Sequence, residues 1–349
     1  MPNMDQLLRE ATDKGASDLH LSAGQAPRLR VDGDLMPLDY PAMSAEEVMA
    51  VVETVLSPEQ LARFEAEHEL DLSCALDDVG RFRVNVFMQS RGPGAVLRRI
   101  PTVIPSLESL GLPPIFTQLC ERERGLVLVT GPTGSGKSTT LAAMVDHINN
   151  TWDAHILTVE DPIEFVHHSK RCLVNQREIG PHTGSFANAL KSALREDPDV
   201  ILVGEMRDLE TISLALTAAE TGHLVFGTLH TSSAPKTIDR IIDVFPSGQQ
   251  GQIRTMLSES LEAVLAQRLL KKKGGGRVAA TEILVGVPAV RNLIREAKLH
   301  QIPSAMQTGQ QYGMQTMDAA IADLTKRGLL ERPAATLKAP SEGMAAAAH

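Results

Sequence analysis

The chain has 349 residues, 43% of them hydrophobic but only 3% aromatic, and a net charge of -9. This length predicts two domains, and the acidic balance argues against a surface built mainly to neutralise nucleic-acid phosphates. No apolar run approaches the roughly 20 residues that span a bilayer, and the polar N-terminus lacks the order of a signal peptide. The three cysteines are widely spaced and suit reduced thiols better than disulfides or a zinc site. We therefore expect a cytoplasmic protein.

The first hundred residues predict a small mixed α/β domain. A helix over 5–14 is followed by the hairpin signal Asp32-Gly33 between two short apolar runs. Two capping boxes, Ser44 with Glu47 and Ser57 with Gln60, predict two further helices. Strands are predicted over residues 18–21, 28–31, 35–38, 71–76, 81–89 and 94–100.

Residues 101–114 hold four prolines and are predicted to link this domain, residues 1–100, to a larger one over 115–332. In the larger domain, short apolar runs alternate with helical segments, which predicts a parallel sheet covered on both faces. From Gly248 the chain is expected to be mostly helical, with an apolar stripe from Ile253 to Leu265 and a lysine-rich helix end at 271–273. Residues 333–349 are expected to form a flexible tail. The predicted strands cover residues 125–131, 156–160, 200–204 and 224–229.

Residues 131–139, Gly-Pro-Thr-Gly-Ser-Gly-Lys-Ser-Thr, lie between a predicted strand and a predicted helix over 140–149, which is the context of a P-loop. The glycines let backbone N–H groups point at phosphate oxygens, and the helix adds the positive end of its dipole. Lys137 would reach the β and γ phosphates, and the Ser138 hydroxyl would ligate Mg²⁺. A chance match in such a chain is on the order of 1% at ordinary residue frequencies. The motif predicts an ATP site formed by Gly131, Pro132, Thr133, Gly134, Ser135, Gly136, Lys137, Ser138 and Thr139.

Acidic residues follow two further predicted strands. One apolar strand ends at Gly204 and delivers Glu205 to the carboxyl edge of the sheet, where ligands bind in open α/β sheets. Glu205 is interpreted as the group that polarises the attacking water, rather than as a surface carboxylate. Glu160, Asp161 and Glu164 emerge at the same edge and could position water or Mg²⁺. Glu164 is either a direct catalytic contact or a solvated loop acid.

Two histidines, His223 and His230, bracket the strand over 224–229. Their spacing across a strand does not give the shared face that a zinc site needs. This strand is expected beside the one that ends at Glu205, so His230 is predicted to sense the γ-phosphate. For His223 a functional role and a hydrogen-bonded structural role stay open.

Together these elements resemble the secretion ATPases of bacterial type IV pilus and type II secretion machines. Residues 131–139 look like their Walker A motif, 160–165 like their Asp box, 200–208 like their atypical Walker B motif with a glutamate, and 220–231 like their His box. Residues 287–294 are similar to a C-terminal motif of the pilus retraction ATPases, with Val290 in place of isoleucine. A small domain that starts near residue 1 and the lack of a tetracysteine zinc motif favour this branch over extension or type II secretion ATPases.

The resemblance implies a RecA-like P-loop ATPase domain, an N-terminal PAS-like domain and a homohexamer that hydrolyses ATP to drive pilus retraction and twitching motility. It implies an inner-membrane platform protein and a PilU-like paralogue as partners, at the inner face of the cytoplasmic membrane. Arg81 and Arg83 share one face of a predicted strand. In a ring they would act as arginine fingers on a bound nucleotide, whereas a solvated strand face is the alternative. Arg98 is a further candidate.

Residues 287–294 carry no obvious chemistry, since Val290, Leu293 and Ile294 form one apolar stripe of a helix. Core packing accounts for such a stripe, whereas the resemblance suggests an interface with the platform protein. Two alternatives of other classes are a RecA-like DNA translocase and a scaffold that binds nucleotide without hydrolysing it. The translocase predicts basic, aromatic-lined loops and turnover stimulated by nucleic acid, against which the acidic balance and the few aromatic residues argue.

Overall fold

The computed structural model of the chain divides into two units, Met1–Val103 and Ile104–His349, and the large hydrophobic core of each contains residues of that unit alone. The structure describes residues 2–31, 33–76, 79–100 and 103–330. Three predicted features lie outside the described residues: Asp32 of the hairpin, positions 101–102 of the linker, and the tail over 333–349.

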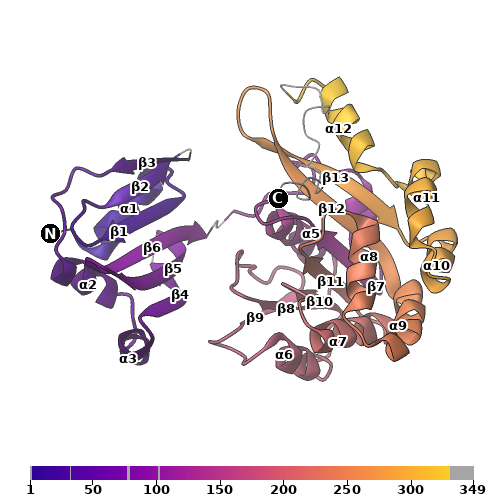
Figure 1. The fold of residues 1–349 in the computed structure, drawn as a ribbon, viewed down its shortest axis with the longest axis horizontal. Coiled ribbons are helices and arrows are strands. Elements are labelled where there is room, and N and C mark those ends of the chain that lie inside the picture. Colours follow the sequence, from indigo (N-terminus) through magenta and orange to yellow (C-terminus); the bar gives the residue numbers. More distant parts are fainter. Residues whose placement is uncertain (1, 32, 77–78, 101–102, 331–349) are drawn as a thin grey trace, which may run out of the picture. The chain divides into compact units, whose positions relative to one another are not determined.

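The first unit is built on a six-stranded sheet in the order β3-β2-β1-β6-β5-β4, in which all neighbouring strands run antiparallel (Figure 1). Both predicted capping boxes are present, and a third, which was not predicted, joins Asn3 and Gln6. Each box satisfies backbone N–H groups that a helix start leaves unpaired. The helices are α1 (Met4–Asp13), α2 (Ala45–Glu53) and α3 (Pro58–Glu67), and the strands are β1 (Asp18–Ser22), β2 (Arg28–Val31), β3 (Asp34–Pro37), β4 (Glu69–Leu76), β5 (Gly80–Gln89) and β6 (Gly92–Ile100).

The second unit contains a seven-stranded sheet in the order β13-β12-β7-β11-β10-β8-β9, in which only β13 runs antiparallel to its neighbour. All residues of the three central strands β7, β11 and β10 are buried, as their continuous apolar runs predict. The predicted α/β fold class is therefore confirmed. The strands are β7 (Gly125–Thr130), β8 (His155–Glu160), β9 (Leu173–Glu178), β10 (Val200–Val203), β11 (Leu224–Leu229), β12 (Leu261–Lys271) and β13 (Arg277–Val285).

Figure 1 shows the helices of this unit gathered around the sheet. They satisfy the requirement that a parallel sheet be covered on its faces. The helices are α4 (Ile115–Cys120), α5 (Lys137–Thr151), α6 (Phe186–Ala193), α7 (Leu209–Glu220), α8 (Ala234–Asp243), α9 (Ser247–Ser260), α10 (Pro288–Arg295), α11 (Ile302–Thr308) and α12 (Met317–Lys326), with short 3₁₀ turns at Leu299–Gln301 and Gln310–Tyr312.

The prediction of a mostly helical segment after Gly248 is wrong in one part. The apolar stripe from Ile253 to Leu265 does not form one helix, because α9 ends at Ser260 and β12 begins directly after it. A short apolar run fits a helix and a buried strand equally well, and here pairing with β7 on one side and β13 on the other decides for the strand. The lysine-rich run at 271–273 consequently lies at a hairpin turn rather than at a helix end. Strands β9 and β13 were also not predicted.

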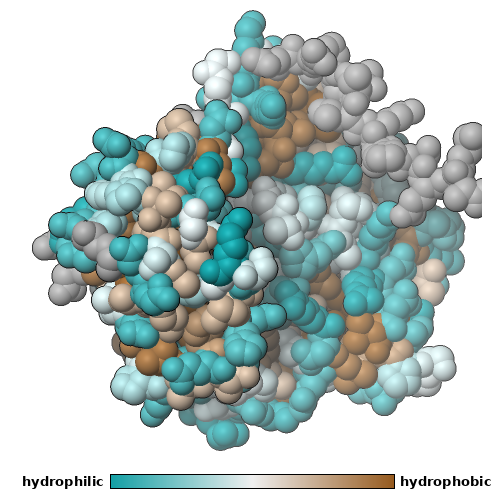
Figure 2. All heavy atoms as spheres, turned by 60° about the vertical axis from the view of Figure 1, so that its left-hand side comes forward, coloured by the Kyte–Doolittle hydropathy of each residue, from teal (hydrophilic) through white to brown (hydrophobic). Residues whose placement is uncertain are grey.

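Figure 2 shows one face, on which hydrophilic residues predominate and apolar residues form small patches. Exposed apolar residues of this scattered kind are common on protein surfaces. Within residues 2–330, apart from the short undescribed gaps, no helix has both the length and the apolar character that crossing a membrane requires.

Candidate active site

The loop over residues 131–136 joins the buried strand β7 to helix α5, as the motif predicts. Gly131, Gly134 and Gly136 have φ values of 143°, 76° and 89°, in a region that other residues rarely adopt. A Cβ on Gly131 would also lie 2.4 Å from the carbonyl oxygen of Gln267 in β12. Gly136 is the N-cap of α5, so the loop ends at the positive end of a 15-residue helix. Such a helix start favours bound anions.

Lys137 lies buried in the first turn of α5. Its ammonium group donates hydrogen bonds to the carbonyl oxygens of Gly131 (2.9 Å) and Pro132 (3.3 Å). Burial lowers the pKa of Lys137, while the negative charges of Glu205 and Glu164 act in the opposite direction. The structure thus brings the lysine of the P-loop within electrostatic reach of both predicted catalytic acids.

Two buried polar atoms at the loop have no hydrogen-bond partner within the described part of the chain: Ser135 Oγ and Gln267 Oε1. The amide nitrogen of Gln267 donates to Thr140 Oγ1 on α5 at 2.9 Å, which fixes this side chain against the P-loop helix. Since buried polar atoms in proteins are usually paired, these two oxygens indicate a site for a polar ligand.

Parallel register brings the predicted residues to one edge of the sheet. Thr130 of β7 lies opposite Leu229 of β11, which sets His230 beside the start of the P-loop. Strand β10 is in parallel register with both β8 and β11, so Glu205 and Glu160 emerge at the same edge. Ligands bind at this carboxyl edge in open α/β sheets.

Two side chains contact the carboxylate of Glu205: one is positively charged, and the other is a histidine, which can be protonated. Arg207 forms an ion pair with it through both carboxylate oxygens, one of them at 2.7 Å, and His230 Nε2 lies 3.1 Å from Glu205 Oε1. Burial acts to raise the pKa of Glu205, but hydrogen bonds from Arg207 and the charge of His230 outweigh it, so the pKa lies below its usual value. Glu205 is therefore a carboxylate at neutral pH.

Glu160, at the end of β8, has a different environment. Its carboxylate accepts hydrogen bonds from Thr158 Oγ1 (2.8 Å) and Gln176 Nε2 (3.1 Å). Burial raises the pKa of Glu160 to about 7 against these two hydrogen bonds, and the charge of Glu164 adds to the rise. Glu160 therefore exchanges its proton near neutral pH.

Glu164 lies in the loop between β8 and β9 and is exposed. Asp161, in the same loop, lies near enough to Arg207 for their charges to interact. The predicted Asp box is therefore an acidic loop at the P-loop edge. Direct contact between Glu164 and a substrate stays a prediction.

His223 is placed away from this edge. It lies at the opposite end of β11 from His230, where its Nδ1 contacts the carbonyl oxygen of Ala218 at 2.9 Å and Thr221 Oγ1 at 3.4 Å. Both contacts link the histidine to the end of α7. Of the two alternatives left open for His223, these contacts favour the structural role.

The candidate arginines lie in the first unit. Phe82, Val84 and Val86 of β5 are buried while Arg81 and Arg83 are not, which confirms the predicted alternation. Arg81 donates to Ser73 Oγ (3.2 Å) and Arg83 lies 3.9 Å from Asp71 on the neighbouring strand β4. A further candidate, Arg98, pairs at 2.8 Å with Asp18, which is buried.

Helix α10 carries the motif over residues 287–294. Val290 and Ile294 are fully buried and Leu293 is partly buried, so the predicted packing stripe is confirmed. The stripe packs into the core of the second unit.

Arg291 of α10 is held by the protein itself. It pairs with Glu262 at 2.7 Å and donates to the carbonyl oxygens of Gly286, Ser258 and Glu259. These contacts satisfy carbonyl groups at the end of α9, as a C-terminal cap does. Charge reversal at Arg291 would break this network, so it cannot test whether α10 contacts the platform protein. The exposed Asn292 and Arg295 on the same helix are better positions for that test.

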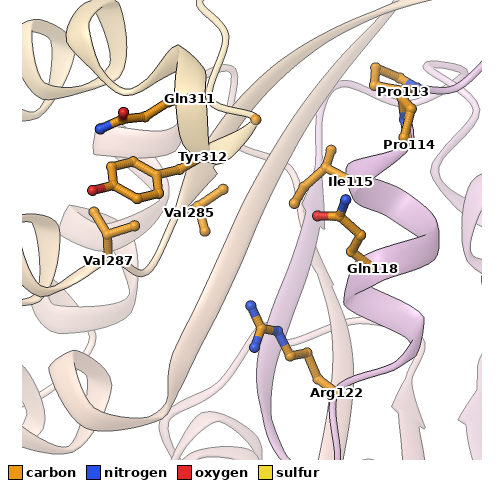
Figure 3. A pocket seen from close by; sticks show the side chains of 10 residues that line it. Pro113, Pro114, Ile115, Gln118, Arg122, Val285, Val287, Gln311 and Tyr312 are labelled. Carbon is orange, nitrogen blue, oxygen red and sulfur yellow. The ribbon is translucent and has the colours of Figure 1, made fainter.

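A pocket of about 480 Å³ lies elsewhere in the second unit (Figure 3). Ile115, Gln118 and Arg122 form one wall, and Val287 and Tyr312 lie on the other. The residues that line it include none of the P-loop residues or predicted catalytic acids. We assign no role to it.

Three side chains at the edge were not singled out from the sequence: Arg207, Gln176 and Gln267. Arg207 stands two residues after Glu205, and an arginine so close to a strand-end acid is a signal that sequence reasoning can use. Gln176 and Gln267 reach the site from β9 and β12, and no local pattern marks either of them.

Comparison with known proteins gives concordant results. The relatives include the type IV pilus retraction ATPase PilT of Pseudomonas aeruginosa, 58% identical over 337 residues that cover 97% of this chain and 98% of the relative. A twitching motility protein of Neisseria gonorrhoeae is 61% identical over 320 residues, 91% of this chain and 86% of the relative. A crystal structure of the pilus retraction motor PilT with bound ADP matches with a TM-score of 0.92 and 50% identity, covering 98% of both chains.

The model of one protein family, described as type II/IV secretion system protein, matches residues 1–274. The match includes the P-loop and both acidic strand ends. The chain therefore belongs to the type II/IV secretion system protein family.

Proposed function

We propose that this chain is an ATP-hydrolysing motor subunit that drives retraction of a type IV pilus. The proposal rests on the sheet edge that places the buried Lys137, at the start of α5, and the carboxylate of Glu205, after β10, at the same end of neighbouring parallel strands. The names of the similar proteins, a pilus retraction ATPase and a twitching motility protein, support the same function.

Magnesium-bound ATP is the substrate that fits the P-loop. The helix start at Gly136, the Lys137 ammonium group and the unpaired Ser135 hydroxyl all suit phosphate oxygens. The bound ADP of the similar PilT structure supports a nucleotide at this site. The Ser138 hydroxyl, one residue into α5, would hold Mg²⁺, which neutralises phosphate charge.

Glu205 is proposed to orient and activate the water that attacks the γ-phosphate. Its lowered pKa keeps it ionised at neutral pH, so it accepts a hydrogen bond from water. His230, which contacts Glu205, would report the presence of the γ-phosphate. Glu164 is the alternative base, since its charge also reaches Lys137.

A homohexameric ring at the inner face of the cytoplasmic membrane is the proposed assembly, with ATP and Mg²⁺ bound in each subunit. In the ring, Arg81 and Arg83 would stabilise the charge that spreads over the transferred phosphoryl group. The inner-membrane platform protein and a PilU-like paralogue are the proposed partners.

Nucleotide binding and turnover by the purified protein test the proposal. The wild-type chain should hydrolyse Mg-ATP without stimulation by single-stranded DNA, and Lys137→Ala should lower ATP affinity at least about tenfold because a charge-assisted contact is worth roughly 1.5–3 kcal/mol. Lys191→Ala, which removes an exposed lysine of α6 paired with Glu210, is the matched control. No uptake of Mg-ATP by the wild-type chain would refute the ATPase assignment, and stimulation by DNA would favour a translocase.

The ring and the retraction role need separate measurements. If Arg81→Ala together with Arg83→Ala leaves the ATPase activity of the hexamer undiminished, these arginines have no part in the reaction. A deletion strain should accumulate surface pili that do not retract, and normal twitching motility in that strain would contradict the proposed role.

A further inference from the structure

The carboxamide of Gln176, on the edge strand β9, contacts the acidic loop that carries Asp161 and Glu164. Gln176 Nε2 donates to Glu160 Oε1 (3.1 Å) and to the carbonyl oxygen of Phe165 (2.9 Å). Gln176 Oε1 accepts a hydrogen bond from the backbone N–H of His167 (2.7 Å). One side chain thus contacts the residue before the loop and two residues on the far side of Glu164.

The sheet register makes this arrangement possible. Gln176 pairs in parallel register with Thr158 of β8, whose hydroxyl donates to the same oxygen of Glu160. Alternate residues of a strand point to the same face, so Gln176, Thr158 and Glu160 lie on one face of the sheet. The neighbouring Asn175 contacts His155 Nε2 instead, at 2.9 Å.

Two other buried side chains also hold parts of the same loop. Glu178 accepts from the backbone N–H of Ile163 (3.1 Å), and Asn149 pairs with the backbone of His168 and Lys170. Glu178 thus fixes the residue directly before Glu164, and Asn149 fixes the part of the loop that leads to β9. Gln176 links Glu160 to Phe165 and His167, which lie on the far side of Glu164.

We propose that Gln176 is a positioning residue for ATP hydrolysis: it sets the place of Glu164 and of Glu160 at the P-loop edge without touching the nucleotide. This inference rests on the proposed ATPase function. A carboxamide is suited to the task because it offers two donors and an acceptor at once. A displacement of about 1 Å in a catalytic constellation can cost up to about a hundredfold in rate.

The first test is the steady-state kinetics of Gln176→Ala. We expect kcat to fall about 10- to 100-fold, while KM for ATP and ADP affinity stay within about threefold, because none of the P-loop contacts involves Gln176. Asn175→Ala is the matched control on the same strand and should keep wild-type kcat. Wild-type kcat in a folded Gln176→Ala protein, or an equal loss in Asn175→Ala, would overturn the inference.

A second test uses the conservative variant Gln176→Glu. At pH 8 its carboxylate removes both donors and places a like charge beside Glu160, so kcat should lie below that of Gln176→Ala. As the pH falls, one proton is shared between Glu160 and the carboxyl group introduced at position 176, and this proton restores a hydrogen-bond donor. The difference in kcat from Gln176→Ala should then shrink. A deficit that does not change with pH contradicts the proposed contact.

Amide hydrogen exchange gives a readout that does not depend on activity. In Gln176→Ala the backbone N–H of His167 loses its acceptor and should exchange about fivefold faster, since the hydrogen bond is worth on the order of 1 kcal/mol, while the amides of β8 keep their rates. Unchanged exchange at His167 would overturn the inference. If the wild-type protein has no ATPase activity, the proposed function fails, and the exchange measurement still decides whether Gln176 holds the loop.

Discussion

Glu205 and Glu160 leave neighbouring strands at the same edge of the sheet, yet their pKa values shift in opposite directions. Burial is the largest influence on both and raises both. Glu205 is paired with the charged Arg207 and with His230, which outweigh burial. Glu160 receives its hydrogen bonds from neutral side chains and from the backbone of Glu164, which do not outweigh burial.

Each acid accepts hydrogen bonds from two side chains, so the charge of these donors decides the direction in which the pKa of the acid shifts. An ion pair stabilises the ionised form over the neutral form far more than a neutral hydrogen bond does. Sites that push two carboxyl groups apart in pKa commonly give them different roles. Here Glu205 is suited to act as an ionised acceptor and Glu160 to carry a proton near neutral pH.

The largest effect is expected from Glu205→Gln, which removes the ionised acceptor and keeps its shape. We expect kcat for ATP to fall by about 10²- to 10⁴-fold, the usual contribution of general base catalysis, with ATP affinity retained. Steady-state turnover and equilibrium nucleotide binding measure the two effects. Glu210→Gln, at an exposed acid of α7, is the control. If Glu205→Gln turned over normally, the catalytic role would pass to Glu164.

Glu160→Gln tests the raised pKa of Glu160 through the stability of the fold. Because the pKa of Glu160 is raised to about 7 in the folded chain, the unfolded chain binds fewer protons between its own lower pKa and pH 7. Stability from this group is therefore fully present at low pH and is lost as the pH rises to about 7. Relative to wild type, Glu160→Gln should gain stability from pH 5 to pH 8, by on the order of 3 kcal/mol at most.

Urea unfolding of both proteins at pH 5 and pH 8 measures this difference. Glutamine keeps an acceptor for Thr158 and Gln176, so packing at the site is preserved. A stability difference that is the same at both pH values would show that Glu160 does not titrate near neutrality.

Arg207→Ala should have the smallest effect, because most of the Arg207 side chain is exposed and solvent screens its charge. Without Arg207 the pKa of Glu205 should rise, since burial then acts against a weaker opposing charge. The acid limb of the pH profile of kcat should therefore move to higher pH, by less than about one unit. A profile measured from pH 5 to pH 9 that coincides with wild type would show that Arg207 does not set the charge of Glu205.

The sequence predicts those parts of the site that are encoded within one short segment. The P-loop is recognised because strand, glycine loop and helix follow one another. His230 stands directly after the buried strand β11, and Glu205 stands one residue beyond the buried strand β10. The capping boxes in the first unit are equally local. The relationship to pilus retraction ATPases, inferred from these motifs in order, is confirmed by the comparisons.

The parts that the sequence does not predict depend on contacts between distant segments. The run Leu261-Glu-Ala-Val-Leu-Ala consists largely of residues with high helix propensity, and it becomes a strand only because β7 and β13 pair with it. Gln176 contacts Glu160 from 16 residues away, and Gln267 contacts Thr140 from 127 residues away. The pKa values of the acids follow from burial and partners, which composition and spacing do not specify.

The close approach of Gln267 to Gly131 bears on how an inactive reference protein should be made. Alanine at position 131 would need both a rare backbone angle and space that the β12 backbone already fills, so it would loosen the central strands as well as impair ligand uptake. Gly134 has no atom within 4 Å of the place a Cβ would take, so a change there strains the loop alone. Gly131 is therefore needed for the packing of the sheet. A substitution at Lys137 separates nucleotide binding from folding better than one at Gly131.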